Sequence, residues 1–371
     1  MSASTPKKFV FAGGGTGGHL YPAIALAQEL QRRLPTAAVH FVGTARGIEA
    51  RVIPQHGFPL HLIAVRGARR SSAPANLLLP FVLAFSLLQS LILLIRLRPA
   101  AVIGTGGYVS GPVLLTAALL GLPTIIQEQN SRPGVTTRML ARIASRVHIS
   151  FDVSRRWFRG RRLWLSGNPV RAFDPSISPA QARTRFGLSP QRMTLLVFGG
   201  SQGAQALNAA VLGSLSELFA RVDLQVLWST GKGDFAHISK AVEPFGERVR
   251  VLPFIDDMEG AYRAADLAVT RSGALTLAEL TLCGLPAVLV PFPYAAANHQ
   301  EANARALEAC GAALVILQKS LTPNVLTETV GALLCDAHRR ARMSEAAKKA
   351  AFPHAARDIV DSILEVTERK E

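Results

Sequence analysis

Two glycine-rich segments, about half a chain apart, constrain the fold more than any other feature of this sequence. Residues 13–18 follow the apolar run 9–12, and residues 199–203 follow the apolar run 195–198. A buried strand, a glycine turn and the first turn of a helix together form a phosphate cradle, because backbone N–H groups and the positive end of the helix dipole point at one spot. Two such cradles predict paired Rossmann-like domains that face each other across a cleft.

Short apolar runs alternate with helical stretches along both halves of the chain, which predicts an α/β fold with one parallel sheet per half. The expected strands are residues 8–12, 39–42, 61–65, 101–104, 124–127, 147–149 and 162–165 in the first half, and 194–198, 225–229, 249–253, 267–270, 287–290 and 313–316 in the second. A helix is expected from Pro22 to Arg33. With 371 residues, the chain exceeds what one core usually supports.

A stretch rich in proline and polar residues near 168–179 separates the two halves. We therefore expect one domain over residues 1–170 and a second domain over residues 171–352. The remaining residues, 353–371, are expected to form a last helix that packs back on the first domain. Three scattered cysteines predict no disulfide framework, and the first residues lack the apolar run of a signal peptide. A reducing, cytoplasmic location is expected.

Positive charge is concentrated in the first half of the chain. The net charge is +16, and residues 1–173 carry 21 Lys and Arg against four acidic residues, whereas residues 174–371 carry 20 against 21. A one-sided positive field predicts an anionic partner for the first half, namely membrane lipid, nucleic acid or a polyanionic substrate. Nucleic acid is disfavoured because no stacking aromatic residues accompany the basic ones.

The apolar segment from Leu77 to Ile95 lies between basic residues and allows three interpretations: a transmembrane helix, a buried helix, or a helix that packs on its sheet and keeps apolar side chains exposed. Its interruptions are Pro80, Ser86, Gln89 and Ser90, and its flanking arginines are Arg66, Arg69, Arg70, Arg96 and Arg98. Polar interruptions and positive charge at both ends argue against a span. We expect the third arrangement, which docks on an anionic membrane surface.

The first glycine segment also fits the dinucleotide pattern with Gly13, Gly15 and Gly18. That pattern needs an acidic residue at the end of the second strand, and residues 41–44 contain none. NAD binding is therefore disfavoured. His19, at the start of the following helix, is either a packing residue or a general base.

Further polar and glycine-rich segments follow other predicted strands. Residues 104–112 offer a second set of backbone amides in the first half, and residues 127–130 place polar side chains on the same rim. In the second half, residues 271–279 repeat the strand, turn and helix pattern, and Glu279 is either a ribose ligand or a plain surface residue. Residues 298–301 begin another helix with side chains suited to a sugar. Because no Asp-x-Asp triplet occurs, we expect helix dipoles and amides to stabilise a leaving diphosphate without a metal.

The ordered segments 14–19, 106–112, 128–130, 167–171, 199–204 and 271–274 resemble the MurG family of bacterial glycosyltransferases. The resemblance implies a GT-B fold and metal-independent, inverting transfer of GlcNAc from UDP-GlcNAc to the C4 hydroxyl of undecaprenyl-pyrophosphoryl-MurNAc-pentapeptide. This step converts lipid I to lipid II in peptidoglycan synthesis. It also implies that residues 1–170 form the acceptor and membrane-docking domain and that residues 171–352 form the UDP-GlcNAc-binding domain. The protein is then expected to be peripheral, on the cytoplasmic face of the bacterial inner membrane.

The same resemblance assigns roles to individual residues. His19 is implied as the catalytic base. Donor binding is implied for Thr16, Gly17, Gly18, Asn130, Arg171, Ser201, Ile255, Ala274, Leu275, Thr276, Leu277, Ala278, Glu279 and Gln300, and acceptor binding for Gly14, Gly15, Gly106, Gly107 and Tyr108. One departure is Gln127, where the family usually has histidine, so no catalytic role of that histidine applies here. Two other functions stay open: a related GT-B transferase with another glycolipid acceptor, and a non-catalytic nucleotide-sugar binding protein.

Overall fold

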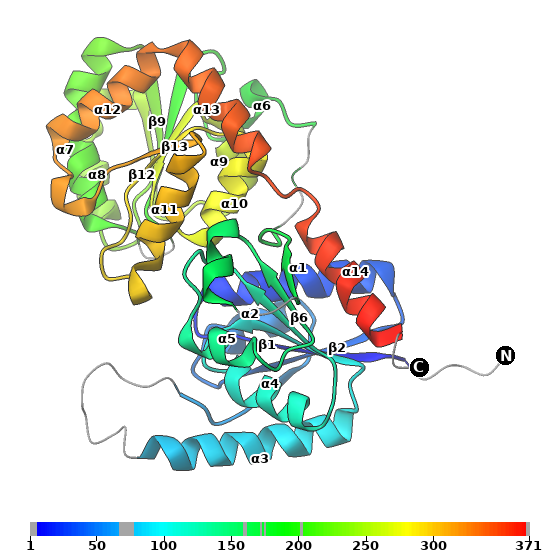
Figure 1. The fold of residues 1–371 in the computed structure, drawn as a ribbon. Coiled ribbons are helices and arrows are strands. Elements are labelled where there is room, and N and C mark those ends of the chain that lie inside the picture. The colour runs from blue at the N-terminus through cyan, green and yellow to red at the C-terminus, as the bar shows by residue number, and fades with distance from the viewer. Residues whose placement is uncertain are drawn as a thin grey trace. The chain divides into compact units, whose positions relative to one another are not determined.

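The computed structural model describes residues 6–66, 78–158, 162–170, 173, 176–200 and 203–368. Contacts within the chain divide it into two compact units. Unit 1 comprises Met1–Arg171 and His354–Glu371, and unit 2 comprises Ala172–Pro353. Each unit is an α/β structure built on one parallel sheet (Figure 1).

The sheet of unit 1 has seven strands in the order β3-β2-β1-β4-β5-β6-β7, and all of its neighbouring strands run parallel. The strands are β1 Lys8–Gly13, β2 Ala38–Gly43, β3 Leu60–Leu62, β4 Ala101–Gly106, β5 Thr124–Glu128, β6 Arg146–Ile149 and β7 Leu163–Leu165. The central strands are buried on both faces, which is why they read as continuous apolar runs.

Helices cover both faces of this sheet. They are α1 Gly17–Arg33, α2 Glu49–Gln55, α3 Leu79–Leu97, α4 Ser110–Leu119, α5 Val135–Leu140 and α14 Ala355–Glu368, with the 3₁₀ helix η2 Asp152–Trp157 after β6. One core cluster joins α1, α2 and α14 to side chains such as Phe9 and Phe11, and the other joins α3, α4 and α5 to side chains such as Val10 and Val102.

All seven strands predicted for the first half are present, and most of their ends lie within two residues of the prediction. One helix start and one strand end differ by more. Helix α1 begins at Gly17, five residues before the predicted start at Pro22. Pro22 is the sixth residue of α1, so the helix continues through a proline at the cost of one backbone hydrogen bond. Strand β3 ends at Leu62 instead of Val65. There the backbone N–H of Ala64 donates to Gln89 Oε1 of α3 at 2.7 Å, which diverts it from the ladder.

Unit 2 repeats the architecture with six parallel strands in the order β10-β9-β8-β11-β12-β13. The strands are β8 Met193–Phe198, β9 Leu224–Ser229, β10 Val249–Leu252, β11 Leu267–Thr270, β12 Ala287–Leu289 and β13 Ala313–Val315. The α-helices are α6 Pro179–Arg185, α7 Gln205–Arg221, α8 Phe235–Ala241, α9 Met258–Ala264, α10 Ala274–Cys283, α11 His299–Ala309, α12 Pro323–Cys335 and α13 Ala337–Lys349, and the 3₁₀ helices are η3 Glu243–Arg248, η4 Ala296–Asn298 and η5 Gln318–Ser320.

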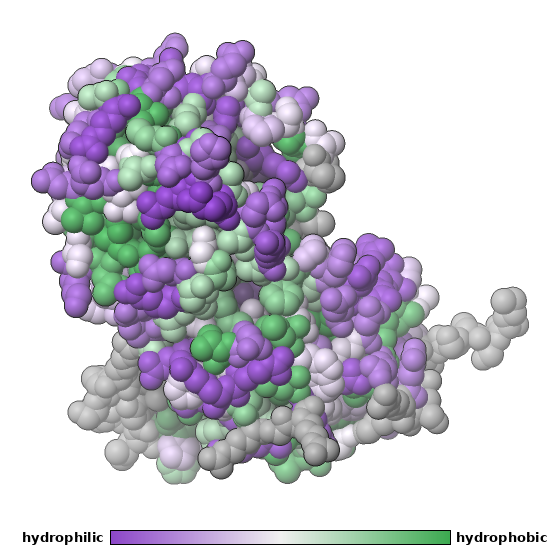
Figure 2. Space-filling view, turned by 45° about the horizontal axis from the view of Figure 1, so that its top comes forward, coloured by the Kyte–Doolittle hydropathy of each residue, from purple (hydrophilic) through white to green (hydrophobic). Residues whose placement is uncertain are grey.

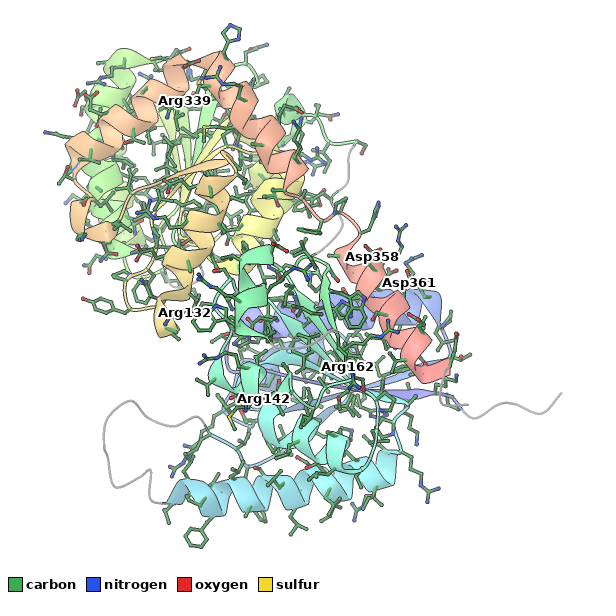
Figure 3. The ribbon with its side chains drawn as sticks, viewed as in Figure 1. Arg132, Arg142, Arg162, Arg339, Asp358 and Asp361 are labelled. Atoms are coloured by element: carbon green, nitrogen blue, oxygen red, sulfur yellow. The ribbon has the colours of Figure 1, made fainter. Side chains whose placement is uncertain are left out.

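The chain returns to unit 1 in α14, which packs on α1 (Figure 1). Ile359, Val360 and Ile363 are completely buried in the unit 1 core. Asp358 and Asp361 lie on the outer side of the helix (Figure 3), and Figure 2 shows hydrophilic residues gathered over it. The helix is therefore amphipathic, with its apolar stripe completing the core of a sheet that began far earlier in the sequence.

Helix α3 has the opposite pattern, because its protein-facing side carries Ser86, Ser90 and Leu94 while its apolar side chains face outward. The exposed members include Leu78, Phe81, Leu83, Phe85, Leu88, Ile92 and Ile95, and Phe81 is 74% exposed. Figure 3 shows side chains projecting from the side of α3 that is turned away from α4. Among the described helices, α3 is the one with the length and composition to cross a membrane. An apolar face of this size marks a surface that another phase or partner covers.

Both sheets reverse their strand order beside the first strand, between β1 and β4 in unit 1 and between β8 and β11 in unit 2. Loops leave in opposite directions at such a switch point, which opens a crevice at the carboxyl ends of the strands. The two glycine-rich segments follow β1 and β8, so each lies at the switch point of its own unit.

Candidate active site

At the switch point of unit 1, the loop after β1 touches the loop after β4. A Cβ atom added to Gly107, whose φ is +80°, would lie 2.5 Å from the carbonyl oxygen of Gly14. One added to Gly106, whose φ is +103°, would lie 2.6 Å from Nδ1 of His19. Only glycine fits at these two positions, because a side chain would be both strained and overlapping. Because these loops approach so closely, the backbone of the loop after β1 and that of the loop after β4 lie together at the carboxyl edge of the sheet, which we call the rim.

A buried carboxylate beneath the first loop fixes its shape. Glu49 of α2 is completely buried, and its Oε2 accepts the N–H of Gly15 at 3.0 Å. Its Oε1 accepts the backbone N–H and the hydroxyl of Thr44 at 3.0 and 2.9 Å. Hydrogen bonds to a charged acceptor are about twice as strong as neutral ones. Glu49 therefore holds the glycine loop in one conformation, and its charge is satisfied from inside the protein.

His19 is the third residue of α1 and is half-buried at the same rim. Its backbone carbonyl accepts the Thr105 hydroxyl at 2.7 Å, which ties the first turn of α1 to β4. Its ring Nδ1 lies 3.0 Å from Oε1 of Gln129. Among the described residues, none forms a hydrogen bond with the other ring nitrogen, Nε2.

Glu128 is the last residue of β5, and Asn130 lies two residues further along the chain. Glu128 is buried, and its Oε1 accepts the backbone N–H of Asn130 at 3.0 Å and its Nδ2 at 3.3 Å. Burial raises the pKa of Glu128, and the bonds from Asn130 and the nearby His19 oppose that rise. The carboxylate thus orients the Asn130 amide on the rim that also carries His19.

At the switch point of unit 2, the loop after β8 again requires glycine. A Cβ atom on Gly203, whose φ is +76°, would overlap the carbonyl oxygen of Thr230, and one on Gly199 would overlap Ala204. The loop runs from the end of β8 to the first residue of α7, Gln205. Ser201, in the middle of this loop, and Arg171, in the stretch that joins the units, lie outside the described residues.

Helix α10 begins at Ala274 with Gly273 as its N-cap, so its amino end stands at the same switch point, after β11. Glu279 lies on the second turn, and its Oε2 accepts the hydroxyl of Tyr262 at 2.8 Å. Burial, followed by the charge of Glu279, raises the pKa of Tyr262 well above its usual value. The hydroxyl consequently remains a donor, which holds the carboxylate in one orientation.

The loop before α11 is strained and ends in polar contacts. Ala297 and Asn298 have φ values of 51° and 53°, in the left-handed region that residues other than glycine seldom adopt. Just beyond them, Oε1 of Gln300 accepts the N–H of Phe292 at 3.0 Å, and its carbonyl accepts the Ser272 hydroxyl at 2.8 Å. These bonds join the amino end of α11 to the β11 loop. Strain of this kind is concentrated at functional sites.

Comparison with known proteins decides the family. The family model described as "Glycosyltransferase family 28 N-terminal domain" matches residues 9–149. The model described as "Glycosyltransferase family 28 C-terminal domain" matches residues 194–359. The chain belongs to glycosyltransferase family 28. It is therefore an enzyme of the hexosyltransferase type, as the sequence predicted.

Relatives within this family are similar to the chain along nearly its whole length. A protein of Chlorobaculum parvum is 45% identical over 366 residues, covering 96% of this chain and 98% of its own. One of Prosthecochloris aestuarii is 46% identical over 361 residues, covering 95% and 97%. Both are named UDP-N-acetylglucosamine–N-acetylmuramyl-(pentapeptide) pyrophosphoryl-undecaprenol N-acetylglucosamine transferase. The resemblance to the MurG family is confirmed.

Among solved structures, MurG of Acinetobacter baumannii superimposes with a TM-score of 0.80 at 32% identity, covering 97% of this chain and 100% of that one. A UDP-glucose: anthocyanidin 3-O-glucosyltransferase, at 16% identity and a TM-score of 0.71, shares the fold. With two parallel α/β sheets and these neighbours, the predicted GT-B fold class is confirmed.

The structure of this family 28 chain places most of the predicted site residues at the two switch points. In unit 1 the rim gathers His19 and Asn130 with the loop residues Gly14, Gly15, Thr16, Gly17, Gly18, Gly106, Gly107 and Tyr108. In unit 2, residues 274–279 form the first two turns of α10, and Gln300 lies in the first turn of α11. Ile255, which the resemblance places in the donor site, is only 2% exposed in this structure.

Sequence reasoning did not single out Glu49, Gln129 or Tyr262. Each is a buried polar residue that touches a predicted site residue: Gly15, His19 and Glu279 respectively. One signal was available for Glu49, because an acidic residue is rare in the basic first half of the chain. Among the described residues, no three His, Cys, Asp or Glu side chains lie close enough to hold a metal ion.

Proposed function

We propose that this chain transfers N-acetylglucosamine from UDP-N-acetylglucosamine to the C4 hydroxyl of undecaprenyl-pyrophosphoryl-N-acetylmuramyl-pentapeptide, with inversion at the anomeric carbon. The observation that carries the proposal is similarity at 45–46% identity, over nearly the whole chain, to relatives bearing the corresponding name. The site geometry supports it, since each unit presents a glycine-rich loop and a helix amino end at its switch point.

In the proposed reaction, the acceptor hydroxyl gives its proton to His19 while its oxygen bonds to the anomeric carbon of the donor sugar. The bond from that carbon to the diphosphate breaks on the opposite side, and UDP departs with the electron pair. The amino end of α10 and the loop after β8 face the departing diphosphate and stabilise its charge. Glu279, oriented by Tyr262, accepts from the ribose hydroxyls. Bound metal is not required in this scheme.

The membrane-docking part of the proposal concerns unit 1. A lipid-linked acceptor stays in the bilayer, so the enzyme must work at the membrane surface. The outward apolar face of α3 and the exposed Arg96 and Arg98 at its end combine the two attractions that hold a peripheral protein on anionic lipid. We propose peripheral attachment at the cytoplasmic face of the inner membrane through this helix.

A transfer assay tests the function. The purified chain is mixed with radiolabelled UDP-N-acetylglucosamine and a lipid I analogue, with and without a chelator. We expect labelled disaccharide lipid under both conditions. Loss of transfer in the presence of the chelator would contradict the metal-independent step. Labelling of a different glycolipid in place of the analogue would point to another acceptor.

His19→Ala is the matched variant in that assay. We expect kcat to fall by about 10²- to 10⁴-fold, the usual contribution of a general base. Binding of UDP, measured by calorimetry, should be retained, because His19 lies in unit 1, whereas most of the residues proposed to bind the donor nucleotide lie in unit 2. Normal turnover by this variant would remove His19 as the base, and UDP binding without any transfer by the wild type would indicate a binding protein.

A further inference from the structure

Beside His19, a buried amide side chain has its orientation set by backbone carbonyls. Gln129 is 1% exposed. Its Nε2 donates to the carbonyl oxygens of Thr105 at 2.7 Å and Gln127 at 3.1 Å, and also to Oε1 of Gln127. Its Oε1 lies 3.0 Å from Nδ1 of His19. Every polar atom of the Gln129 side chain is therefore engaged within unit 1.

These contacts allow only one of the two amide orientations. A backbone carbonyl can only accept, so the group that faces Thr105 and Gln127 must be the NH₂. If the amide were rotated by half a turn, Oε1 would face two carbonyl oxygens in a buried place, and two acceptors would be left without donors. Oε1 consequently faces His19, and because it too can only accept, Nδ1 of His19 must carry the hydrogen.

We propose that Gln129 is a positioning residue that holds His19 in the Nδ1–H tautomer, leaving Nε2 unprotonated as the atom that takes the acceptor proton. This inference rests on the proposed function for its catalytic meaning, but the tautomer itself is a property of the protein alone. A neutral imidazole has one donor and one acceptor nitrogen, and the hydrogen bond made by one nitrogen sets the role of the other. In solution the ring would sample both forms.

The amide orientation of Gln127 is also set by its hydrogen bonds, and Gln127 in turn contacts Gln129. The Nδ2 of Asn168 donates to the Gln129 carbonyl at 3.1 Å, so Oδ1 of Asn168 is turned to Gln127 and accepts from its Nε2 at 3.1 Å. Oε1 of Gln127 is left to accept from Gln129. The neutral amide of Gln127 has one donor end and one acceptor end. It completes a chain of hydrogen bonds that runs from Asn168 through Gln127 and Gln129 to His19.

The partner of His19 is uncharged, which distinguishes this arrangement from a carboxylate–histidine pair. Glu128 is the nearby carboxylate, but its Oε1 is turned to Asn130. A carboxylate on Nδ1 both fixes the tautomer and stabilises the imidazolium, whereas an amide fixes the tautomer alone. Gln129 thus keeps the base in its correct form without adding negative charge next to a site that binds diphosphates.

Nitrogen-15 NMR of the full chain labelled in histidine tests the tautomer without any substrate. Long-range proton–nitrogen correlations separate a protonated from an unprotonated ring nitrogen, and the His19 signals are those absent from His19→Ala. In the pH range where the ring is neutral, we expect a protonated Nδ1 and an unprotonated Nε2. The reverse pattern in the wild type would overturn the proposal, whatever the transfer assay shows.

Gln129→Leu adds the kinetic test, because leucine fills the space but cannot accept from Nδ1. We expect kcat to fall by about 10- to 10³-fold, the KM for UDP-N-acetylglucosamine to stay unchanged, and the His19 nitrogen signals to move toward a mixture of tautomers. Unchanged signals together with unchanged kcat would also overturn the proposal. Should this variant not fold, the wild-type spectrum decides alone.

Gln225→Leu is the matched control for the loss of a buried amide. Gln225 of β9 is also 1% exposed, and its Nε2 donates to the carbonyls of Ser189 and Arg192 in unit 2. The two variants should lose similar stability in urea. Only Gln129→Leu should change the His19 spectrum and kcat, and an equal fall in kcat for both would reduce Gln129 to a structural residue.

Discussion

At the scale of single residues, buried polar side chains do most of the positioning in this protein. Glu49 holds the first glycine loop, Gln129 holds His19, and Tyr262 holds Glu279. Each forms hydrogen bonds that are directed, so each fixes an orientation that apolar packing would leave open. His148 is a further example, and it links a strand of unit 1 to α14.

His148 makes unit 1 sensitive to acid. Its ring lies between the hydroxyls of Ser166 at 2.7 Å and Ser362 at 2.9 Å. Burial, and then the charge of Arg146, lowers the pKa of His148 to about 3. In the unfolded chain the ring titrates near pH 6.5. The neutral ring therefore contributes its full stability above about pH 6.5, and this contribution is lost as the pH falls from there toward 3, because only the unfolded state takes up the proton.

We expect the free energy of unfolding of unit 1 to decrease below pH 6.5 by up to about 1.4 kcal/mol per pH unit from this residue. Urea unfolding at several pH values measures it. His148→Asn, which does not titrate, should be less stable at pH 7 but should show a shallower decrease in acid. Since carboxylates also titrate in this range, the difference between the two slopes is the quantity to compare, and equal slopes would contradict the assignment.

At the scale of elements, α3 differs from the other helices because its outer face is its apolar face. Ser86 and Ser90 pack inward with their hydroxyls donated to the carbonyls of Leu83 and Ser86. Such a helix can lie close to its own protein, since small residues allow close approach, while Phe81 and its exposed neighbours remain outside. In water the exposure of this apolar face is costly, and the membrane attachment proposed above would bury it.

Charge reversal beside α3 should weaken membrane binding. Each basic residue near an anionic surface contributes about 1 kcal/mol, so Arg96→Glu with Arg98→Glu should lower partitioning onto phosphatidylglycerol vesicles by at least about 30-fold at low salt. Vesicle sedimentation measures it. Arg339→Glu with Arg342→Glu, in α13 of unit 2, makes the same change in net charge and should alter binding much less. Equal effects of the two pairs would mean that overall charge, and not this surface, attracts the protein.

At the scale of the whole molecule, the chain leaves unit 1, forms unit 2 completely, and then returns to finish unit 1. The last helix is essential to the first sheet, because Ile359, Val360 and Ile363 are completely buried against side chains of β1, β4 and α1. Ion pairs of Arg33 with Asp361 and of Arg146 with Glu365 add specificity at the edges of the contact. The core of unit 2 includes no residue of α14.

Truncation after Pro353 should therefore unfold unit 1 and spare unit 2. Removing a large buried aliphatic side chain costs about 2–5 kcal/mol. The loss of three such side chains is comparable to the whole free energy of unfolding of a typical domain. Hydrogen exchange with mass spectrometry should show lost protection in β1 and β4 and retained protection in β8 and β11. Truncation after Glu368 is the control and should change neither unit. Retained protection in β1 would contradict the role given to α14.

Local features of the sequence determined the elements of this protein and the positions of its two glycine loops. Strands buried on both faces must be continuously apolar, and a backbone that passes close to another must be glycine, so both are readable without a partner. The charge asymmetry and the apolar segment around α3 were equally visible. All thirteen predicted strands are present, and the largest difference in a strand end, at β3, lies where the Gln89 side chain accepts a backbone N–H.

Only the tertiary structure decided which distant residues meet. Strand order brings residues 105–107 beside His19, places Glu49 under Gly15 and sets α14 on α1. No periodicity encodes these contacts, because they depend on which strands become neighbours. The same holds for the exposed face of α3, since composition is alike for a buried and an outward-facing apolar helix. The tautomer inferred for His19 depends on the amide side chains of Gln129, Gln127 and Asn168, and their orientations exist only in the folded chain.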